Sequence, residues 1–403
     1  MQYISLFSGI GTCGVALNPL GFRPLYFSET NSFNRDLLQQ KYPGVKNLGD
    51  IAQINWLDLI DANHCDLIIG GSPCQSFSLA GYKKGLEDER GLLLLEFLRA
   101  IESNKPKWFI FENVPGICQG KNVKVFLTFL AYLSHIGYVT DWDILNTLDF
   151  CLPQRRRRIY TVGYLSKPPT FFELDRRVTI EDVKSKWDEI YDKVEQTYQV
   201  RGATLLSMGI FSIYLGARYF PFFRDSEGTP RYEVVPPQSL QSVLEPKDSE
   251  KRLKSKYALS TKAITGILNR AERQDKKVFN GLLYLANKKK LSPTELENHP
   301  DICFNSKGYT QDSGEVCPTL RSGGSRGGAT PPAIYRSPDI LRFLTEEECE
   351  RLQGLPAGYT DIIHKGKKAN KTVRYKAIGQ GFSAPVVAWI GGEIKERLKG
   401  SHL

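Results

Sequence analysis

The first 165 residues alternate short apolar runs with amphipathic stretches of helical period, and this alternation constrains the fold more than any other feature. Apolar, β-rich runs stand at residues 3–7, 24–29, 67–71, 108–113 and 158–165. Helical stretches include residues 31–41, 92–103 and 123–136. Strand–helix alternation predicts a mainly parallel α/β sheet that binds ligands at the carboxyl ends of its strands.

A chain of 403 residues is longer than one hydrophobic core usually serves, so we expect a large domain and a smaller one. The character changes near residue 167, where the Pro-rich segment KPPTFF leaves the alternating part. A charged helical segment (180–198) and an aromatic run (209–223) follow, and the latter favours a buried β element. We predict domain limits at 1–172, 173–336 and 337–403.

The chain after the Gly-rich loop at 322–332 carries two helix signals. The segment LTEEECERLQGL begins like a capped helix, with Thr345 as N-cap and Glu348 at the third helical position. The segment VVAWIGGEIKERL predicts a final amphipathic helix. We also expect residues 337–403 to return to the first domain.

The net charge of +10 and the pI near 9.0 suggest a polyanionic partner. Residues 250–290 contain twelve Lys and Arg residues but only three acidic residues, which are Glu250, Glu272 and Asp275. Such a run is often a solvated helix face. Beside the motifs described next, a phosphate-contacting surface is the better interpretation.

The eight cysteines contain no C-x-x-C pair, and the five histidines do not cluster. We therefore expect no metal site and no disulfide framework. The opening MQYISLFSGIG has no basic region before its apolar run, which indicates a buried strand rather than a signal peptide. No stretch approaches the roughly 18 apolar residues of a membrane span, so we expect a cytoplasmic protein without a membrane partner.

A glycine turn follows the first apolar run, in LFSGIGTCGVAL. Gly9 and Gly11 permit a tight strand-to-helix turn and close backbone approach to a ligand, although a plain tight turn would explain them equally well. Glu29 ends the second strand, where an acid can accept both ribose hydroxyls. Asp50, in GDI, comes next, where a third strand end is plausible. Two acids in succession beside a glycine turn suit an adenosine-bearing cofactor.

The sharpest motif is GGSPCQSFS, which places Cys74 after the strand at 67–71. In isolation, a turn cysteine is more often inert than reactive. However, FENVPG closes the next strand and puts Glu112 at the adjacent sheet edge. A carboxylate would raise a thiol's pKa, so Glu112 makes better sense as a partner for the substrate. QRRRR (154–158) is either a surface cluster or a set of arginines for an anionic or carbonyl-rich ligand.

In this order, the motifs resemble the cytosine-5 DNA methyltransferase family of prokaryotic or phage type. Its blocks are F-S-G-I-G, an acid after the second strand, G-D-I, P-C-Q, E-N-V, Q-x-R-x-R, P-T-L and a closing glycine block. The resemblance covers residues 1–165 and 316–397. It implies a Rossmann-like, mainly parallel sheet with helices on both faces, as in class I S-adenosylmethionine-dependent methyltransferases. Residues 173–336 would be the target-recognition domain.

By matching position, Cys74 resembles the family's nucleophile, which attacks C6 of a cytosine flipped out of double-stranded DNA. Glu112 would hold N3 and the exocyclic amine, and Arg156 and Arg158 match the two arginines of Q-x-R-x-R, with Arg156 expected near the cytosine carbonyl. The resemblance also implies the following substrate-binding residues: Pro73, Gln75, Ser78 and Asn113.

The implied cofactor is S-adenosyl-L-methionine, with Phe7 near the adenine, Glu29 on the ribose, and Asp50 and Ile51 at the adenine. The remaining expected contacts are Gly9, Ile10, Gly11, Leu93 and Gln380. The closing block departs from the family, because Gly379-Gln380-Gly381 stands where G-N-S is usual. This departure puts the contacts to the methionine end of the cofactor in doubt.

Three alternatives stay open: a methyltransferase of transfer RNA with the same blocks, a catalytically dead DNA-binding relative, and a nicotinamide-dependent oxidoreductase. The long variable segment favours a reader of double-stranded DNA. The intact Cys74, Glu112, Arg156 and Arg158 argue against a dead relative. We further expect a nucleoid-associated monomer, with a cognate restriction endonuclease as a possible partner.

Overall fold

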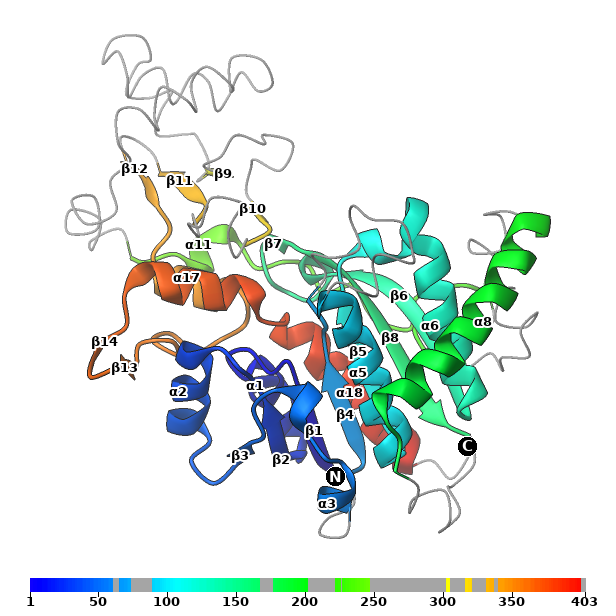
Figure 1. Ribbon diagram of the computed structural model, residues 1–403. Coiled ribbons are helices and arrows are strands. Elements are labelled where there is room, and N and C mark those ends of the chain that lie inside the picture. The colour runs from blue at the N-terminus through cyan, green and yellow to red at the C-terminus, as the bar shows by residue number, and fades with distance from the viewer. Residues whose placement is uncertain are drawn as a thin grey trace. The chain divides into compact units, whose positions relative to one another are not determined.

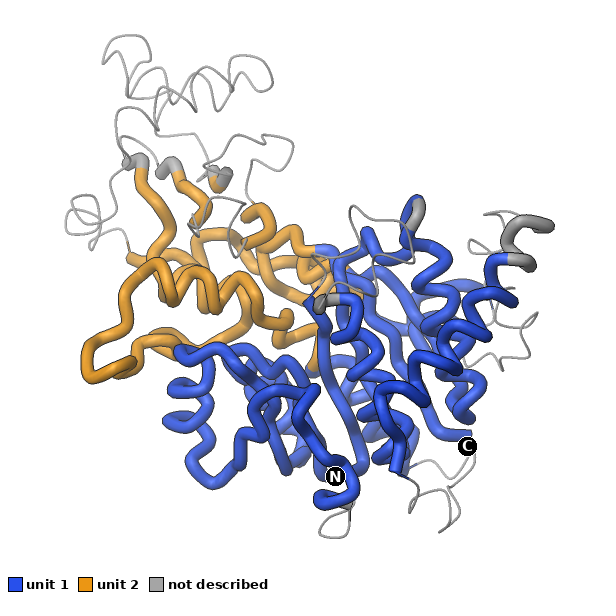
Figure 2. The backbone as a smooth tube through the Cα atoms, in the orientation of Figure 1, with its two compact units in different colours: residues 1–145, 157–233, 388–403 blue, residues 146–156, 234–387 orange. Residues whose placement is uncertain are grey.

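The computed structural model describes residues 1–60, 65–73, 89–166, 177–201, 222–225, 227–246, 302–304, 316–320, 331–336 and 340–399. The chain forms two compact units (Figure 2). Unit 1 comprises residues 1–145, 157–233 and 388–403, and unit 2 comprises residues 146–156 and 234–387. These limits differ from the predicted ones, since most of 337–403 belongs by its contacts to unit 2. The functional division of the chain stays a prediction.

A seven-stranded sheet forms the centre of unit 1, in the order β3-β2-β1-β4-β5-β8-β6 (Figure 1). The strands are β1 Gln2–Leu6, β2 Arg23–Ser28, β3 Lys46–Asn47, β4 Leu67–Gly70, β5 Trp108–Asn113, β6 Tyr138–Asn146 and β8 Arg157–Leu165. The strands from β3 to β5 pair in parallel, whereas β8 is antiparallel to β5. The predicted mainly parallel sheet is confirmed, as are the five predicted strands. The sequence did not predict β6.

The helices of unit 1 include the predicted helical stretches and a short helix at residues 57–60 that the sequence did not predict. They are α1 Thr12–Leu17, α2 Ser32–Lys41, α3 Leu57–Ile60, α5 Glu89–Asn104, α6 Val123–His135, α8 Ile180–Arg201 and, from residue 388, α18 Ala384–Lys399. Short 3-10 turns complete the connections at Asn18–Leu20, Ile51–Gln53, Pro115–Cys118 and Gly120–Asn122. The Asn31 side chain caps α2 by accepting hydrogen bonds from two backbone N–H groups of its first turn.

Both faces of the sheet are covered. Successive side chains of a strand point to opposite sides, so neighbouring residues of one strand pack against different layers. On one face, the rings of Phe109 and Phe111 contact Phe97 of α5. On the other, Trp108 contacts Phe222, which in turn contacts Trp389 of α18. The pairing is tight enough that a Cβ at Gly163 of β8 would lie 1.9 Å from the Phe109 ring.

Unit 2 consists of short elements. Strands β7 Gln154–Arg155 and β10 Cys317–Pro318 pair in parallel, and β9 Ile302–Phe304, β11 Ala333–Arg336 and β12 Ile340–Phe343 form an antiparallel sheet. β13 Ile363–His364 and β14 Lys367–Lys368 form a hairpin. The helices are α11 Leu240–Val243, α16 Glu346–Leu352 and α17 Lys371–Gln380, with a 3-10 turn at Thr147–Asp149. The predicted capping box at Thr345 and Glu348 is confirmed.

Two predicted segments lie largely beyond the described residues. Of the aromatic run at 209–223, only Phe222 and Phe223 are described, and the basic segment at 250–290 lies wholly outside. Among the helices of the described ranges, none is long and apolar enough to cross a membrane. Within the same ranges, no cluster of three or more His, Cys, Asp or Glu residues has the arrangement of a metal site.

Candidate active site

The turn between β1 and α1 adopts a backbone conformation that glycine favours. Gly9 and Gly11 have φ angles of +56° and +73°, and Phe7 takes the same left-handed region at +52°. A left-handed non-glycine residue costs about 1–3 kcal/mol and persists where its surroundings hold it. A Cβ added at Gly9 would meet no described atom within 4 Å. The turn therefore presents open backbone, as close approach by a ligand requires.

Glu29 directly follows β2 and is tied to this turn. Its carboxylate accepts hydrogen bonds from Gly9 N at 2.7 Å, Asn31 N at 2.7 Å and Asn34 Nδ2 at 3.3 Å. A carboxylate has about four acceptor positions. Holding two ribose hydroxyls, as the sequence predicts for Glu29, therefore requires at least one of these bonds to be exchanged.

Asp50 lies three residues beyond the short strand β3 and caps the 3-10 turn Ile51–Gln53. Its Oδ1 accepts a hydrogen bond from Ala52 N at 3.0 Å, and its side chain is exposed, while Ile51 is buried. Leu93, in α5, packs half-buried against the core of unit 1. Ile10, between the two glycines of the turn, is fully buried. Of this set, Asp50 is exposed, whereas Gly9 is half-buried and Gly11 is buried.

The predicted nucleophile, Cys74, lies outside the described residues, as do Gln75 and Ser78. The segment that leads to it is described as far as Pro73, which is exposed. Asn113, at the end of β5, donates from Nδ2 to the Ser72 carbonyl at 3.3 Å, and only 2% of its surface is exposed. Asn113 therefore holds the segment before Cys74 to β5, and the substrate contact predicted for it stays a prediction.

Glu112 and Arg158 form an ion pair at the carboxyl end of β5. Arg158 Nε lies 3.1 Å from Glu112 Oε1, and the two side chains are 16% and 13% exposed. The antiparallel register places Glu112 opposite Tyr160, so that Arg158 is its diagonal neighbour on the same face of the sheet. The pair leaves a partly exposed carboxylate whose orientation is fixed by a guanidinium.

Arg156 belongs to unit 2 and is buried, with 2% of its surface exposed. Its guanidinium donates to three main-chain carbonyls, those of Leu320 at 3.5 Å, Gly379 at 3.3 Å and Gly381 at 2.8 Å. The two arginines of the motif thus have different surroundings. The predicted contact of Arg156 with the cytosine carbonyl stays a prediction, and these bonds give Arg156 a structural task in unit 2.

The family model of the C-5 cytosine-specific DNA methylases matches residues 1–396. The chain belongs to this family. It is 37% identical over 169 residues to the Type II methyltransferase M.NgoBI of Neisseria gonorrhoeae. The matched stretch covers 42% of this chain and 52% of that protein. The match therefore spans about half the length of M.NgoBI. Over its whole length, the chain is 24% identical to the Type II methyltransferase M2.BsuMI of Bacillus subtilis (strain 168), covering 77% of it.

The fold is also that of solved methyltransferase structures. The Entamoeba histolytica methyltransferase EhMeth is similar with a TM-score of 0.58 and 14% sequence identity, covering 99% of this chain and 98% of that chain. This likeness confirms the Rossmann-like fold, with its mainly parallel sheet, that the sequence predicted.

The closing glycine block of this family member stands at the end of α17, within unit 2. Gln353 donates from Nε2 to Ile378 O at 2.9 Å and to Gly381 O at 3.4 Å, next to the bonds from Arg156. Gln380 itself is exposed. Sequence reasoning assigned Gln353 no role, because its partners lie 25 residues or more along the chain.

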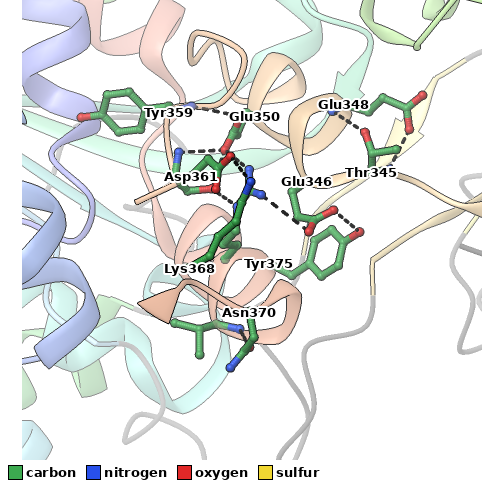
Figure 3. A network of polar contacts seen from close by, with 12 residues as sticks. Thr345, Glu346, Glu348, Glu350, Tyr359, Asp361, Lys368, Asn370 and Tyr375 are labelled. Carbon is green, nitrogen blue, oxygen red and sulfur yellow. Dashed lines mark hydrogen bonds and ion pairs between the residues drawn. The ribbon is translucent and has the colours of Figure 1, made fainter. Parts of the chain in front are cut away.

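A polar network holds α17 in place (Figure 3). Glu350 is fully buried and accepts from Tyr359 N, Thr360 N and Arg374 Nη2 at 3.2, 2.8 and 3.0 Å. Tyr375 donates to Leu344 O at 2.6 Å. The buried Glu350 carboxylate and the Tyr375 hydroxyl therefore both have hydrogen-bond partners, which stabilises the helix that carries the glycine block.

Six cysteines of the described residues, four of them buried and two half-buried, have raised thiol pKa values. Burial raises the pKa of Cys13 to about 11 and that of Cys65 to about 12. Burial also raises the pKa of four other thiols, those of Cys118, Cys151, Cys317 and Cys349. Because the thiolate is the reactive form, a raised pKa makes each of these six thiols less reactive at neutral pH, and the role of Cys74 as nucleophile stays a prediction.

Proposed function

We propose that this protein methylates carbon 5 of cytosine in double-stranded DNA through a covalent adduct between Cys74 and C6 of a flipped base. The observation that carries the proposal is the Glu112–Arg158 pair at the carboxyl end of β5, next to the segment that leads to Cys74. Family membership supports the substrate class, since the matching model is that of cytosine-specific DNA methylases.

The residues around the glycine turn fit S-adenosylmethionine. The open space above Gly9 accommodates a ligand against the backbone, and Glu29 and Asp50 supply carboxylates at neighbouring strand ends. When bound, the cofactor supplies an electrophilic methyl group. The turn and the two acids would hold its adenosine part, while Phe7 would lie against the adenine.

The side chains of this protein divide the remaining work. The Cys74 thiolate adds to C6 of cytosine, which makes C5 electron-rich enough to be methylated. Glu112 holds N3 and favours the proton there, and Arg158 orients the Glu112 carboxylate. Loss of the C5 proton and of the Cys74 sulfur then restores the aromatic ring. Because C6 is inaccessible in a stacked duplex, the base must first leave the helix.

We further propose that residues 173–316 select the DNA sequence. The basic run at 250–290 would contact phosphates, which position the duplex without reading its bases. Replacing Lys276 and Lys277 by Gln should then weaken binding to all sequences alike, with the log–log salt slope reduced by about one per lost contact. Exchange of the segment for that of a relative should transfer the relative's target. Active exchanged proteins that keep the original target would refute this division.

The reaction is tested by incubating the protein with methyl-labelled S-adenosylmethionine and duplex DNA, transfer RNA or neither. We expect label in duplex DNA alone, and 5-methylcytosine after its digestion. Label in transfer RNA but not in DNA would assign the protein to the RNA branch. Absence of label from both would contradict the proposal.

A further inference from the structure

Helix α5 carries a buried arginine, Arg99, that the proposed chemistry does not use. Only 7% of its surface is exposed. Its Nη2 donates to Ile51 O at 2.8 Å and its Nη1 to Ile54 O at 3.0 Å, while its Nε lies 2.6 Å from Glu96 Oε2 one turn earlier. All three nitrogens of the guanidinium are therefore engaged, two of them with the segment that begins at Asp50.

The Arg99–Glu96 pair is buried, and a buried ion pair is by itself a weak source of stability. Removing two charges from water is costly, and a well-packed apolar pair of similar volume is often as stable. Burial raises the pKa of Glu96 even though Arg99 opposes that change, and the nearby Asp50 charge raises it further. Burial of the pair therefore costs free energy of desolvation. Within the described part of the chain, the guanidinium donates to backbone carbonyls and not to a side chain of another helix.

The segment that Arg99 holds buries Ile51, Ile54 and Trp56 in the core of unit 1 and borders a cavity. A cavity of about 290 Å³ is lined by residues 52–57 together with Arg99 and Ser103. Trp56 Nε1 and Ser103 Oγ are buried and have no hydrogen-bond partner among the described residues. The two bonds from Arg99 therefore add a directional restraint on the Ile51 and Ile54 carbonyls, which the apolar burial of the two side chains does not by itself supply.

The conformation of this segment determines where Asp50 presents its carboxylate. Asp50 caps the turn through Ala52 N, so a shift of the Ile51 peptide moves the cap with it. We infer that Arg99 is a positioning residue for the adenine end of the cofactor, acting through the Ile51 and Ile54 carbonyls on Asp50 and Ile51. The inference rests on the proposed use of S-adenosylmethionine.

The test compares Arg99→Lys and Arg99→Ala with the wild type by isothermal titration with S-adenosylmethionine. Lysine keeps a charge opposite Glu96 but loses the planar fork that reaches both carbonyls. We expect both variants to bind the cofactor about tenfold more weakly or worse, with the single-turnover rate at saturating cofactor unchanged. Free guanidinium, which the cavity can admit, should restore affinity to Arg99→Ala but not to Asp50→Ala.

A matched control lies on the same helix. Glu102→Gln removes an ion pair between α5 and Lys186 of α8 that does not touch the turn. It should lower the thermal midpoint without changing cofactor affinity. The double variant of Arg99→Lys with Asp50→Asn should lose no more affinity than the more severe single variant, since both act on one contact.

The outcomes separate the inference from the proposed function. A wild type that does not bind S-adenosylmethionine would refute the function. If the wild type binds the cofactor, either of two results would overturn the positioning role. One is an Arg99→Lys variant with wild-type affinity, and the other is a double variant whose losses of affinity are additive. Arg99→Lys decides the question if Arg99→Ala does not fold.

Discussion

The substitution Glu112→Gln removes the charge of the proposed base-binding carboxylate and keeps its shape. Glu112 Oε1 lies 3.1 Å from Arg158 Nε, and both side chains are less than one fifth exposed. A hydrogen bond to a charged group contributes about 1.5–3 kcal/mol and a neutral one about 0.5–1.5 kcal/mol. Loss of the charge should therefore lower the free energy of unfolding by roughly 1–1.5 kcal/mol at most, because partial exposure screens the pair.

The effect on chemistry should be much larger than the effect on stability. Proton transfer by a positioned group accelerates reactions by about 10²–10⁴-fold. We therefore expect the single-turnover rate of Glu112→Gln to fall by that factor, with S-adenosylmethionine affinity within about twofold of the wild type. Rapid-quench transfer of labelled methyl and isothermal titration measure the two quantities separately.

A second ion pair of unit 1 provides the control. Glu195→Gln breaks the pair with Lys124, whose atoms lie 2.5 Å apart and whose side chains are 36% and 26% exposed. That variant should keep the wild-type rate. Collapse of cofactor binding in Glu112→Gln would show that Glu112 does not contact the base, and an unchanged rate would refute its chemical role.

Three further predictions concern the closing block, the core of unit 2 and the thiols. The double substitution Gln380→Asn with Gly381→Ser should retain or tighten S-adenosylmethionine binding in isothermal titration, because a φ of −64° at position 381 suits serine. A loss of affinity above about tenfold would show that the pocket is rebuilt around Gln380 and Gly381. Glu348→Gln should cost about 3–5 kcal/mol in urea unfolding, since its pair with Arg342 at 2.7 Å is fully buried, and a loss under about 1 kcal/mol would contradict this. Iodoacetamide at pH 8 should modify Cys74 at least about tenfold faster than the buried thiols of raised pKa, and preferential modification of any of these by peptide mass spectrometry would contradict the assignment.

The parts of the fold that follow from local pattern were predictable. The runs that became β4 and β5 are almost wholly apolar, as parallel strands buried on both faces must be. The strand β6 could not be predicted from the sequence, because its carboxylates interrupt the apolar pattern. Asp141 accepts hydrogen bonds from Phe222 N and Phe223 N, and Asp143 from Arg224 Nε, more than 80 residues along the chain.

The same distinction applies to the candidate site. The glycine turn and the acid after β2 lie within 20 residues of each other, and their mutual hydrogen bond reflects adjacent strands that the sequence already indicated. The burial of Arg156 could not be predicted from the sequence, because its hydrogen-bond partners lie 164 to 225 residues further along the chain. Arg99 was missed for a similar reason, because an arginine on an amphipathic helix normally faces solvent.

Covalent trapping tests the central claim most directly. Duplex DNA that carries 5-fluorocytosine at the methylated position should form a stable adduct with the wild type in the presence of S-adenosylmethionine, because fluorine cannot leave as the C5 proton does. Digestion and mass spectrometry should locate the nucleotide on Cys74, and Cys74→Ser should bind the same DNA without forming an adduct. A wild-type protein that methylates ordinary cytosine but forms no adduct, or an adduct on another residue, would contradict the account.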